Sequence, residues 1–341
     1  MTKIAHSEAS NFMSSGRSIN GLVLPLTPPG KHGIPVEGVL NSLAEQHAIF
    51  YEASLDTRLD AVKYAYRDIT TICRAFPAVQ SERFILAMAA WFSLLCQVDD
   101  IIEELDANLA HTALADSIAI LKSNTRVYQG RLVDHDGRFV NPECNRICAL
   151  TRTFVRHLRE LVPASIFIKV ANDVLDVWKN MGLERVVKDG PAPDVESYIS
   201  LKSRTIGLSP FFDILQAELC REIDSKPEVH PSIMWQLERN VALAVALQND
   251  IVGLARDLAH DHALNLISIL TVSGNKSIKV AYEEVVAMHN RAVKAALCSA
   301  SAIRLASHQH GFPCSSDYAD SLLGFIARHF QWASSAQRYV P

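Results

Sequence analysis

Residues 89–105, AAWFSLLCQVDDIIEEL, join an apolar stretch to a run of acidic residues with no helix breaker between them. Apolar residues fill nearly every position from Phe84 to Val98, which is typical of a helix that is buried on all sides. Such a helix needs other elements packed around it. The stretch therefore predicts a helical core, and its acidic end, which starts at Asp99, is expected to border an interior cavity.

Apolar residues recur at helical spacing along most of the chain after residue 36, and runs that alternate apolar with polar residues are scarce. Segments that contain Gly and Pro, such as KDGPAPD and HGFP, separate these stretches. The pattern predicts an all-α fold, with a loop-rich segment over 1–35 and a single helical bundle around a central cavity over 36–341. The expected helices lie near residues 37–52, 57–75, 80–107, 111–124, 142–161, 164–184, 194–219, 231–260, 263–273, 277–306 and 315–337.

Composition argues against several classes of protein. The chain has 341 residues with a net charge of −4, so there is no basic excess to hold a nucleic acid. The seven cysteines match no disulfide or zinc spacing, and we expect free thiols in a reducing compartment. The N-terminus lacks a secretory signal, and the longest apolar run is too short to span a bilayer. These features predict a soluble, cytoplasmic protein.

The acidic run has the chemistry of a metal site. Asp99 and Glu103 are four residues apart, and Asp100 and Glu103 are three apart, so all three lie on neighbouring positions of one helix face. Clustered carboxylates repel one another unless a cation lies between them. Mg²⁺ suits such oxygen ligands, which it commonly combines with water and substrate phosphate. The alternative is an ordinary solvated helix end.

A second segment, VALAVALQNDIVGLARDLAHDHALN over 241–265, repeats this design. Asn249, Gly253 and Asp257 are spaced by four and lie along one helical stripe. Asn249 and Asp257 can each offer an oxygen to a cation, and Arg256 can donate to a phosphate. Taken alone, this segment could also be an exposed helix turn.

Together the two segments resemble the motifs of microbial class I terpene synthases, especially the fungal ones. The family's DDxx(D/E) motif corresponds to DDIIE, and its NDxx(S/T)xxxE motif corresponds to NDIVGLARD, 150 positions further on. The resemblance implies three Mg²⁺ ions that hold the diphosphate of an isoprenyl substrate. It implies metal ligands at Asp99, Asp100, Glu103, Asn249, Gly253 and Asp257. Two positions depart from the family: Gly253 replaces Ser or Thr, and Asp257 replaces the longer Glu.

The segment YISLKSRTIGLSPFFDIL resembles the family's diphosphate-sensing region. Arg204 lies 45 positions before Asn249, which favours it as the sensor, while counting back from Gly207 favours Lys202 instead. Gly207 and Pro210 predict a break in this helix. A structural kink without any sensing role is the alternative.

The C-terminal stretch GFIARHFQWASSAQRYV resembles the family's closing segment, which places Arg338 and Tyr339 on the diphosphate. A frayed chain end is the alternative. A carbocation also needs an inert aromatic lining, and we expect Trp91 and Trp332 to supply part of it.

The resemblance implies that Asp99, Asp100 and Arg204 promote ionisation of the substrate and that the cation cyclises to a hydrocarbon or alcohol. Farnesyl diphosphate is the expected substrate, with geranylgeranyl diphosphate as the alternative. Two other functions stay open: a chain-elongating prenyltransferase, and a non-catalytic interaction protein on the same scaffold. Helical cyclases of this kind are often dimers, so a homodimer is an expectation.

Overall fold

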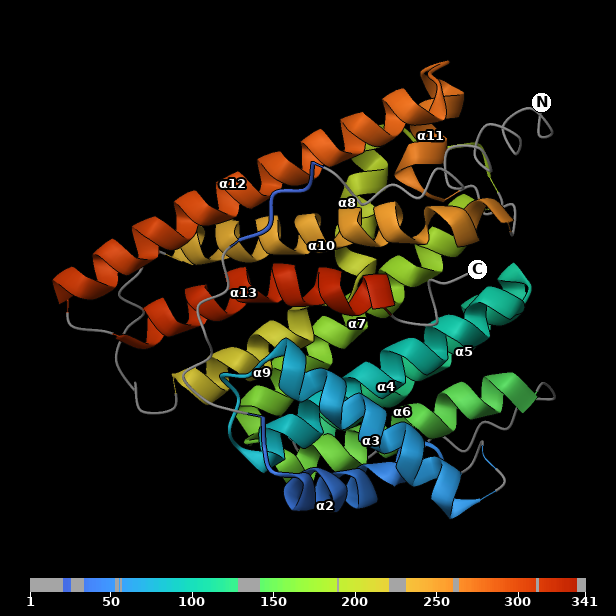
Figure 1. Cartoon of the computed structure of the whole chain (residues 1–341). Helices are drawn as coiled ribbons and strands as arrows, with labels where there is room; N and C mark the ends of the chain where they lie inside the picture. Colours follow the sequence, from blue (N-terminus) through green and yellow to red (C-terminus); the bar gives the residue numbers. More distant parts are fainter. Residues whose placement is uncertain are drawn as a thin grey trace. The chain divides into compact units, whose positions relative to one another are not determined.

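The computed structural model describes residues 21–25, 34–52, 55, 57–127, 142–188, 190–220, 231–259, 264–310 and 313–335 (Figure 1). Every regular element within these ranges is a helix, which confirms the predicted all-α class. All seven cysteines are free, as predicted. The helices are α2 (Glu37–His47), η1 (Ala48–Phe50), α3 (Arg58–Ala75), α4 (Glu82–Glu104), α5 (Ala107–Val127), α6 (Pro142–Leu161), α7 (Ala164–Lys188), α8 (Val195–Thr205), α9 (Ser209–Leu219), α10 (Pro231–Ala259), α11 (Leu266–Ser273), α12 (Ile278–His310) and α13 (Pro313–Ser335).

Side-chain caps explain where several of these helices begin. Thr57 Oγ1 accepts a hydrogen bond from the N–H of Asp60 at 3.1 Å and donates to the Asp60 carboxylate at 2.7 Å. The Asp194 carboxylate accepts from the N–H of Ser197 at 2.8 Å. Each cap supplies a partner for an N–H that the first helical turn leaves unpaired. The predicted helix boundaries lie within a few residues of the observed ones.

The described helices fall into two compact units. One unit contains α8, α10, α11, α12 and α13, together with residues 21–25. In this unit α10 packs against α12 and α13, and these three long helices lie side by side (Figure 1). Its core is aliphatic and includes Leu247, Ile251 and Leu254 from α10, which meet Leu266 and Ile278.

The other unit contains α2 to α6, most of α7, and α9. Its central helix is α4, which contacts α2, α3, α6 and α9 and is buried along most of its length. With 23 residues, α4 is longer than the apolar run suggested and has the length and composition of a membrane-crossing helix. However, 72% of its most apolar window is buried inside the protein, which is typical of a core helix. The single domain expected over 36–341 stays a prediction.

The predicted break after α8 is present. Gly207 has a φ of +69°, in the left-handed region that favours glycine. A Cβ atom at this position would lie 2.7 Å from Leu95 Cδ2 and 3.1 Å from Trp91 Cζ2. The indole N–H of Trp91 donates to the Gly207 carbonyl at 2.8 Å. Gly207 is therefore fixed against α4 by Leu95 and Trp91, one and two turns before Asp99.

Candidate functional site

The first acidic motif lies at the C-terminal end of α4. Asp99 is half-buried, and Asp100 and Glu103 are exposed, while Ile101 and Ile102 between them are buried. The apolar side of the helix end therefore faces the core, and the carboxylates lie on its accessible side. This arrangement leaves the three carboxylates accessible to ligands from solution.

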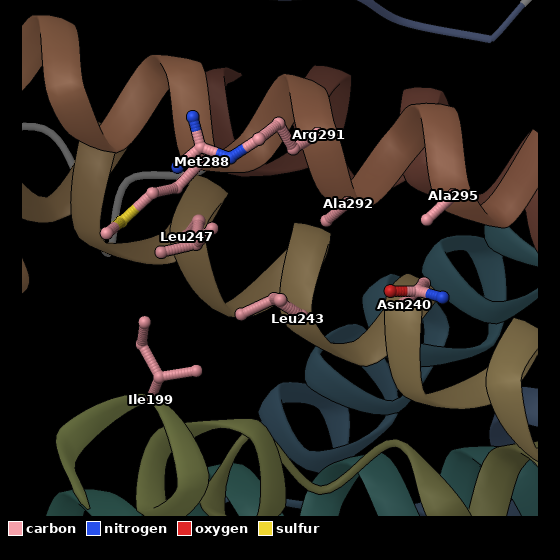
Figure 2. Close-up of a pocket in the computed structure, with 8 residues that line it drawn as sticks. All are labelled: Ile199, Asn240, Leu243, Leu247, Met288, Arg291, Ala292 and Ala295. Atoms are coloured by element: carbon pink, nitrogen blue, oxygen red, sulfur yellow. The ribbon is translucent and has the colours of Figure 1, made fainter. Parts of the chain in front are cut away.

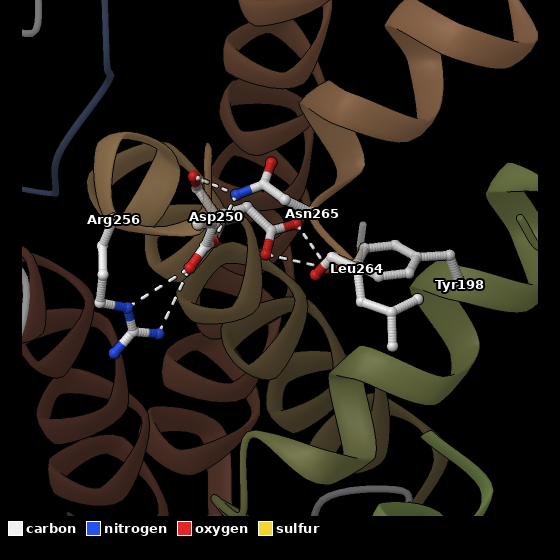
Figure 3. Close-up of polar contacts among 6 residues, drawn as sticks. Tyr198, Asp250, Arg256, Leu264 and Asn265 are labelled. Atoms are coloured by element: carbon white, nitrogen blue, oxygen red, sulfur yellow. Dashed lines mark hydrogen bonds and ion pairs between the residues drawn. The ribbon is translucent and has the colours of Figure 1, made fainter. Parts of the chain in front are cut away.

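The second motif lies near the C-terminal end of α10, in the other unit. Asp250 is only 1% exposed, and the Tyr198 hydroxyl donates to its carboxylate, with 2.9 Å to each oxygen (Figure 3). The N–H of Leu266 donates to Asp250 Oδ2 at 3.1 Å. Burial raises the pKa of this carboxyl to about 7, and the positive charge of Lys202 opposes that rise. Asp250 is thus a structural carboxyl that joins α8 and the start of α11 to α10.

Asp257 is held by two neighbouring side chains. The Asn265 amide donates to Asp257 Oδ2 at 2.9 Å, and the Arg256 guanidinium donates to Oδ1, with 3.4 Å from Nε and 3.3 Å from an Nη. Asn265 is fully buried and also donates to the Asp250 carbonyl at 2.9 Å. Arg256, which we expected to face a phosphate, therefore contacts Asp257 with part of its guanidinium.

Sequence reasoning missed Tyr198 and Asn265. Asn265 carries a recognisable signal, because an Asn directly before the apolar run LISIL is typical of a helix N-cap, and its Oδ1 does accept from the N–H of Ile267 at 3.0 Å. Tyr198 carries no such signal, because only the folded chain brings it to Asp250.

The donor chemistry of both motifs fits Mg²⁺. A carboxylate has about four acceptor positions, two on each oxygen. Two N–H groups of Arg256 bond to Asp257 Oδ1, and one N–H of Asn265 bonds to Oδ2. One acceptor position therefore remains on Oδ2. Within the described ranges, no three His, Cys, Asp or Glu side chains gather closely enough to hold a metal ion by themselves. Mg²⁺ does not need such a cage, because it binds one or two carboxylates and completes its shell with water and phosphate oxygens.

The two candidate sensor residues differ in their surroundings. Lys202 is half-buried and acts electrostatically on the Asp250 carboxyl, whereas Arg204 is exposed. Both residues lie in the last turn of α8, directly before the break at Gly207. Arg338 and Tyr339 lie outside the described residues.

The two predicted lining residues lie in different surroundings. Trp91 has no exposed surface and packs against Phe154, Trp178 and Phe211, so it belongs to the core and holds the helix break. Trp332 is half-buried, and its ring centroid lies 5.6 Å from that of His329.

A buried chain of hydrogen bonds begins at His329. Its Nδ1 lies 2.9 Å from Gln248 Oε1, while Gln248 Nε2 donates to the Ile326 carbonyl at 3.1 Å and lies 3.1 Å from His289 Nε2. Because Gln248 Oε1 can only accept, His329 Nδ1 carries a proton. Burial lowers the pKa of this imidazole to about 4, so its Nε2 carries no proton at neutral pH. His289 Nδ1 in turn lies 3.1 Å from Asn290 Oδ1, so it is the protonated nitrogen of that ring.

Asn290 connects this chain to the N-terminal residues. Its amide donates to the Gly21 carbonyl at 2.7 Å, and its Oδ1 accepts from the N–H of Val23 at 2.8 Å. Residues 21–23 are thereby fixed to α12 by two hydrogen bonds. The chain of polar contacts runs from α13 through α10 and α12 to this segment.

A cavity of about 350 Å³ lies in the unit that contains α10 (Figure 2). Its lining is mostly apolar and comes from α8, α10 and α12: Ile199, Asn240, Leu243, Leu247, Met288, Arg291, Ala292 and Ala295. None of the predicted site residues is among them. Leu247 and Asn249 are two residues apart and so point to different faces of α10. This cavity is therefore distinct from the second acidic motif on α10. The central cavity expected from the sequence stays a prediction.

Comparison with known protein families shows which family the chain belongs to. Residues 90–295 match the model of terpene synthase family 2, C-terminal metal binding, over more than half of the chain and across both acidic motifs. The chain belongs to this terpene synthase family. This confirms the resemblance at the level of the family and the expected metal-binding character of the matched region.

The chain is also similar to individual members. It is 24% identical to germacrene A synthase of Nostoc punctiforme over 152 residues, which span 44% of this chain and 46% of that relative, less than half of its length. Its fold is similar to that of germacradien-4-ol synthase from Streptomyces citricolor, with a TM-score of 0.66, 17% identity, and coverage of 94% of this chain and 100% of that one.

A second similar structure is linalool/nerolidol synthase from Streptomyces clavuligerus in complex with 2-fluorogeranyl diphosphate. It has a TM-score of 0.68, 15% identity, and coverage of 92% of this chain and 100% of that one. These relatives are bacterial, so they do not confirm the expected fungal type.

Proposed function

We propose that this chain is a Mg²⁺-dependent class I terpene cyclase that ionises a linear isoprenyl diphosphate and cyclises the resulting carbocation. The observation that carries the proposal is the family match over residues 90–295, because that range contains both acidic motifs and its family is described as metal-binding. Farnesyl diphosphate is the proposed substrate, in keeping with similar proteins named for germacrene A and germacradien-4-ol. We place the enzyme in the cytoplasm.

The proposed metal ligands are the oxygen atoms of the two motifs. Bound Mg²⁺ would neutralise the diphosphate as it leaves. We expect three Mg²⁺ ions. Their proposed ligands are Asp99, Asp100, Glu103, Asn249 and Asp257. Gly253 has no side-chain oxygen, and water would take that place.

Cationic side chains would hold the diphosphate from other directions. Arg204 is the proposed sensor, with Lys202 as the competing residue, since both lie in the last turn of α8. Arg256, Arg338 and Tyr339 are further proposed donors. Donors of this kind stabilise the negative charge that develops on the leaving group without adding a nucleophile that would quench the cation.

Product analysis tests the proposal. Purified protein is incubated with C10, C15 and C20 isoprenyl diphosphates, with and without Mg²⁺, and the extracts are examined by mass spectrometry. We expect a cyclic product from the C15 substrate that needs Mg²⁺ and is lost in the double variant Asp99→Ala/Asp100→Ala. Glu82→Ala, at the exposed opposite end of α4, is the matched control. Turnover that survives the double change, or that consumes isopentenyl diphosphate instead, contradicts the proposal.

A further inference from the structure

Gly253 and Asp257 lie one helical turn apart on α10 and are in close proximity. A Cβ atom built on Gly253 would lie 3.3 Å from Asp257 Oδ2, and 3.7 Å from Oδ1 and from Cγ. A separation of 3.3 Å is tighter than ordinary van der Waals contact. A side chain at position 253 would therefore press on the carboxylate where it now lies.

The carboxylate has little freedom to move away. Asn265 donates to Oδ2 at 2.9 Å, and Asn265 is itself fixed, because it is fully buried and bonded to the Asp250 carbonyl and the Ile267 N–H. Arg256 donates to Oδ1, the other oxygen of the same carboxylate. Moving the carboxylate by the few tenths of an ångström that a new Cβ requires would strain these charge-assisted bonds.

We propose that Gly253 and Asp257 are a matched pair. The missing side chain at 253 leaves the room in which the short Asp257 carboxylate, positioned by Asn265, offers Oδ2 to a divalent cation that carries a diphosphate. The two departures from the family pattern NDxx(S/T)xxxE thus compensate for one another. The inference has two halves. The packing half is that Gly253 leaves room for the Asp257 carboxylate, and it does not depend on the proposed function. The metal-binding half is that Asp257 Oδ2 binds the cation, and it rests on the proposed function.

A metal-free experiment tests the packing half. In the interior of a helix, Gly→Ala normally stabilises the fold. We expect Gly253→Ala to lower the urea midpoint of the wild-type protein but to raise it in an Asp257→Ala background, where the carboxylate is absent. Gly182→Ala in α7 is the control and should raise the midpoint, because its nearest neighbour would be an ordinary 3.8 Å away. If Gly253→Ala alone raises the urea midpoint as much as Gly182→Ala does, the proposal of a matched pair is wrong.

A metal titration tests the second half. MgCl₂ is titrated at saturating inorganic diphosphate, and the rise in melting temperature reports binding. We expect Gly253→Ser and Asp257→Glu each to weaken the apparent Mg²⁺ affinity by at least about tenfold. The double variant restores the family pattern and should return to within about threefold of the wild type, because contacting residues are non-additive.

The outcomes separate the two proposals. Single effects that simply add in the double variant overturn the matched pair while leaving the proposed function intact. A wild-type protein that shows no shift with Mg²⁺ and inorganic diphosphate contradicts the proposed function and the metal-binding half together. The metal-free cycle decides the packing half in either case.

Discussion

Gly207 shows how one residue can fix a helix break. Its positive φ excludes most side chains, and Leu95 and Trp91 fill the space in which a side chain would begin. The Trp91 indole N–H then satisfies the Gly207 carbonyl, which is buried outside any helix. Conformation, packing and hydrogen bonding at this position therefore all select glycine.

We predict that Gly207→Ala lowers the free energy of unfolding by about 2–4 kcal/mol, because it combines a left-handed non-glycine residue with an overpacked core. Urea denaturation measures the change. Gly38→Ala in α2 is the matched control, since nothing lies within 4 Å of the added methyl, and it should be neutral or slightly stabilising. Equal stability of the two variants would contradict this account of the break.

His329 gives a prediction about pH. Burial lowers its pKa to about 4 from the usual 6.5, so the folded protein keeps this imidazole neutral. The unfolded chain takes up a proton below pH 6.5, while the folded chain does so only near pH 4. The stability contributed by His329 is therefore complete above pH 6.5 and falls as the pH drops from 6.5 towards 4.

We expect this residue to account for a loss of about 2 kcal/mol between pH 7 and pH 5. His329→Asn keeps a donor for Gln248 but cannot titrate, so it should be less sensitive to acid than the wild type by that amount. Urea unfolding at both pH values measures the difference, with His308→Asn, an exposed change on α12, as the control. The hypothesis fails if His329→Asn and the wild type lose stability in parallel.

At the scale of helices, the sequence predicts most of the fold. Apolar spacing predicts the helices to within a few residues, and Gly207 marks the break after α8. The structure adds the side-chain caps Thr57 and Asp194, which the sequence analysis did not use. The contacts that a side chain makes with distant parts of the chain cannot be predicted in this way. The bond from Tyr198 to Asp250 joins residues 52 positions apart, and no local pattern encodes it.

The same distinction explains the site residues. Asp250 reads in sequence as part of an acidic motif, but Tyr198 and the N–H of Leu266 make it a structural joint. Trp91 reads as an aromatic that could line a cavity, but the neighbouring rings and Gly207 enclose it completely. Residue type and spacing locate the motif, whereas the surrounding elements decide which members of it face outward.

Tyr198 tests this joint between helices. We predict that Tyr198→Phe reduces the free energy of unfolding by about 1.5–3 kcal/mol, because a buried carboxylate loses a hydrogen-bond donor. Tyr66→Phe in α3 is the control, since its hydroxyl has no hydrogen-bond partner in the described part of the chain. Urea denaturation of both variants measures the difference. If Tyr198→Phe is as stable as Tyr66→Phe, the hydrogen bond from Tyr198 to Asp250 does not stabilise the packing of α8 on α10.

At the scale of the whole molecule, the two acidic motifs belong to different units, α4 to one and α10 to the other. The family match nevertheless runs through both. If both motifs serve one metal–diphosphate group, as we propose, ligand binding has to stabilise the protein through both helices together. A ligand held by one motif alone would not depend on the other.

We therefore predict that MgCl₂ and inorganic diphosphate together raise the melting temperature, and that either one alone has little effect. At a hundred times the dissociation constant, binding adds about 2.7 kcal/mol to the free energy of unfolding. Asp99→Asn/Asp100→Asn on α4 and Asn249→Ala on α10 should each abolish most of this shift, while Glu82→Ala leaves it intact. Differential scanning fluorimetry of the four proteins makes the comparison. A shift that one motif preserves after the other is removed would mean that the motifs bind their ligands independently.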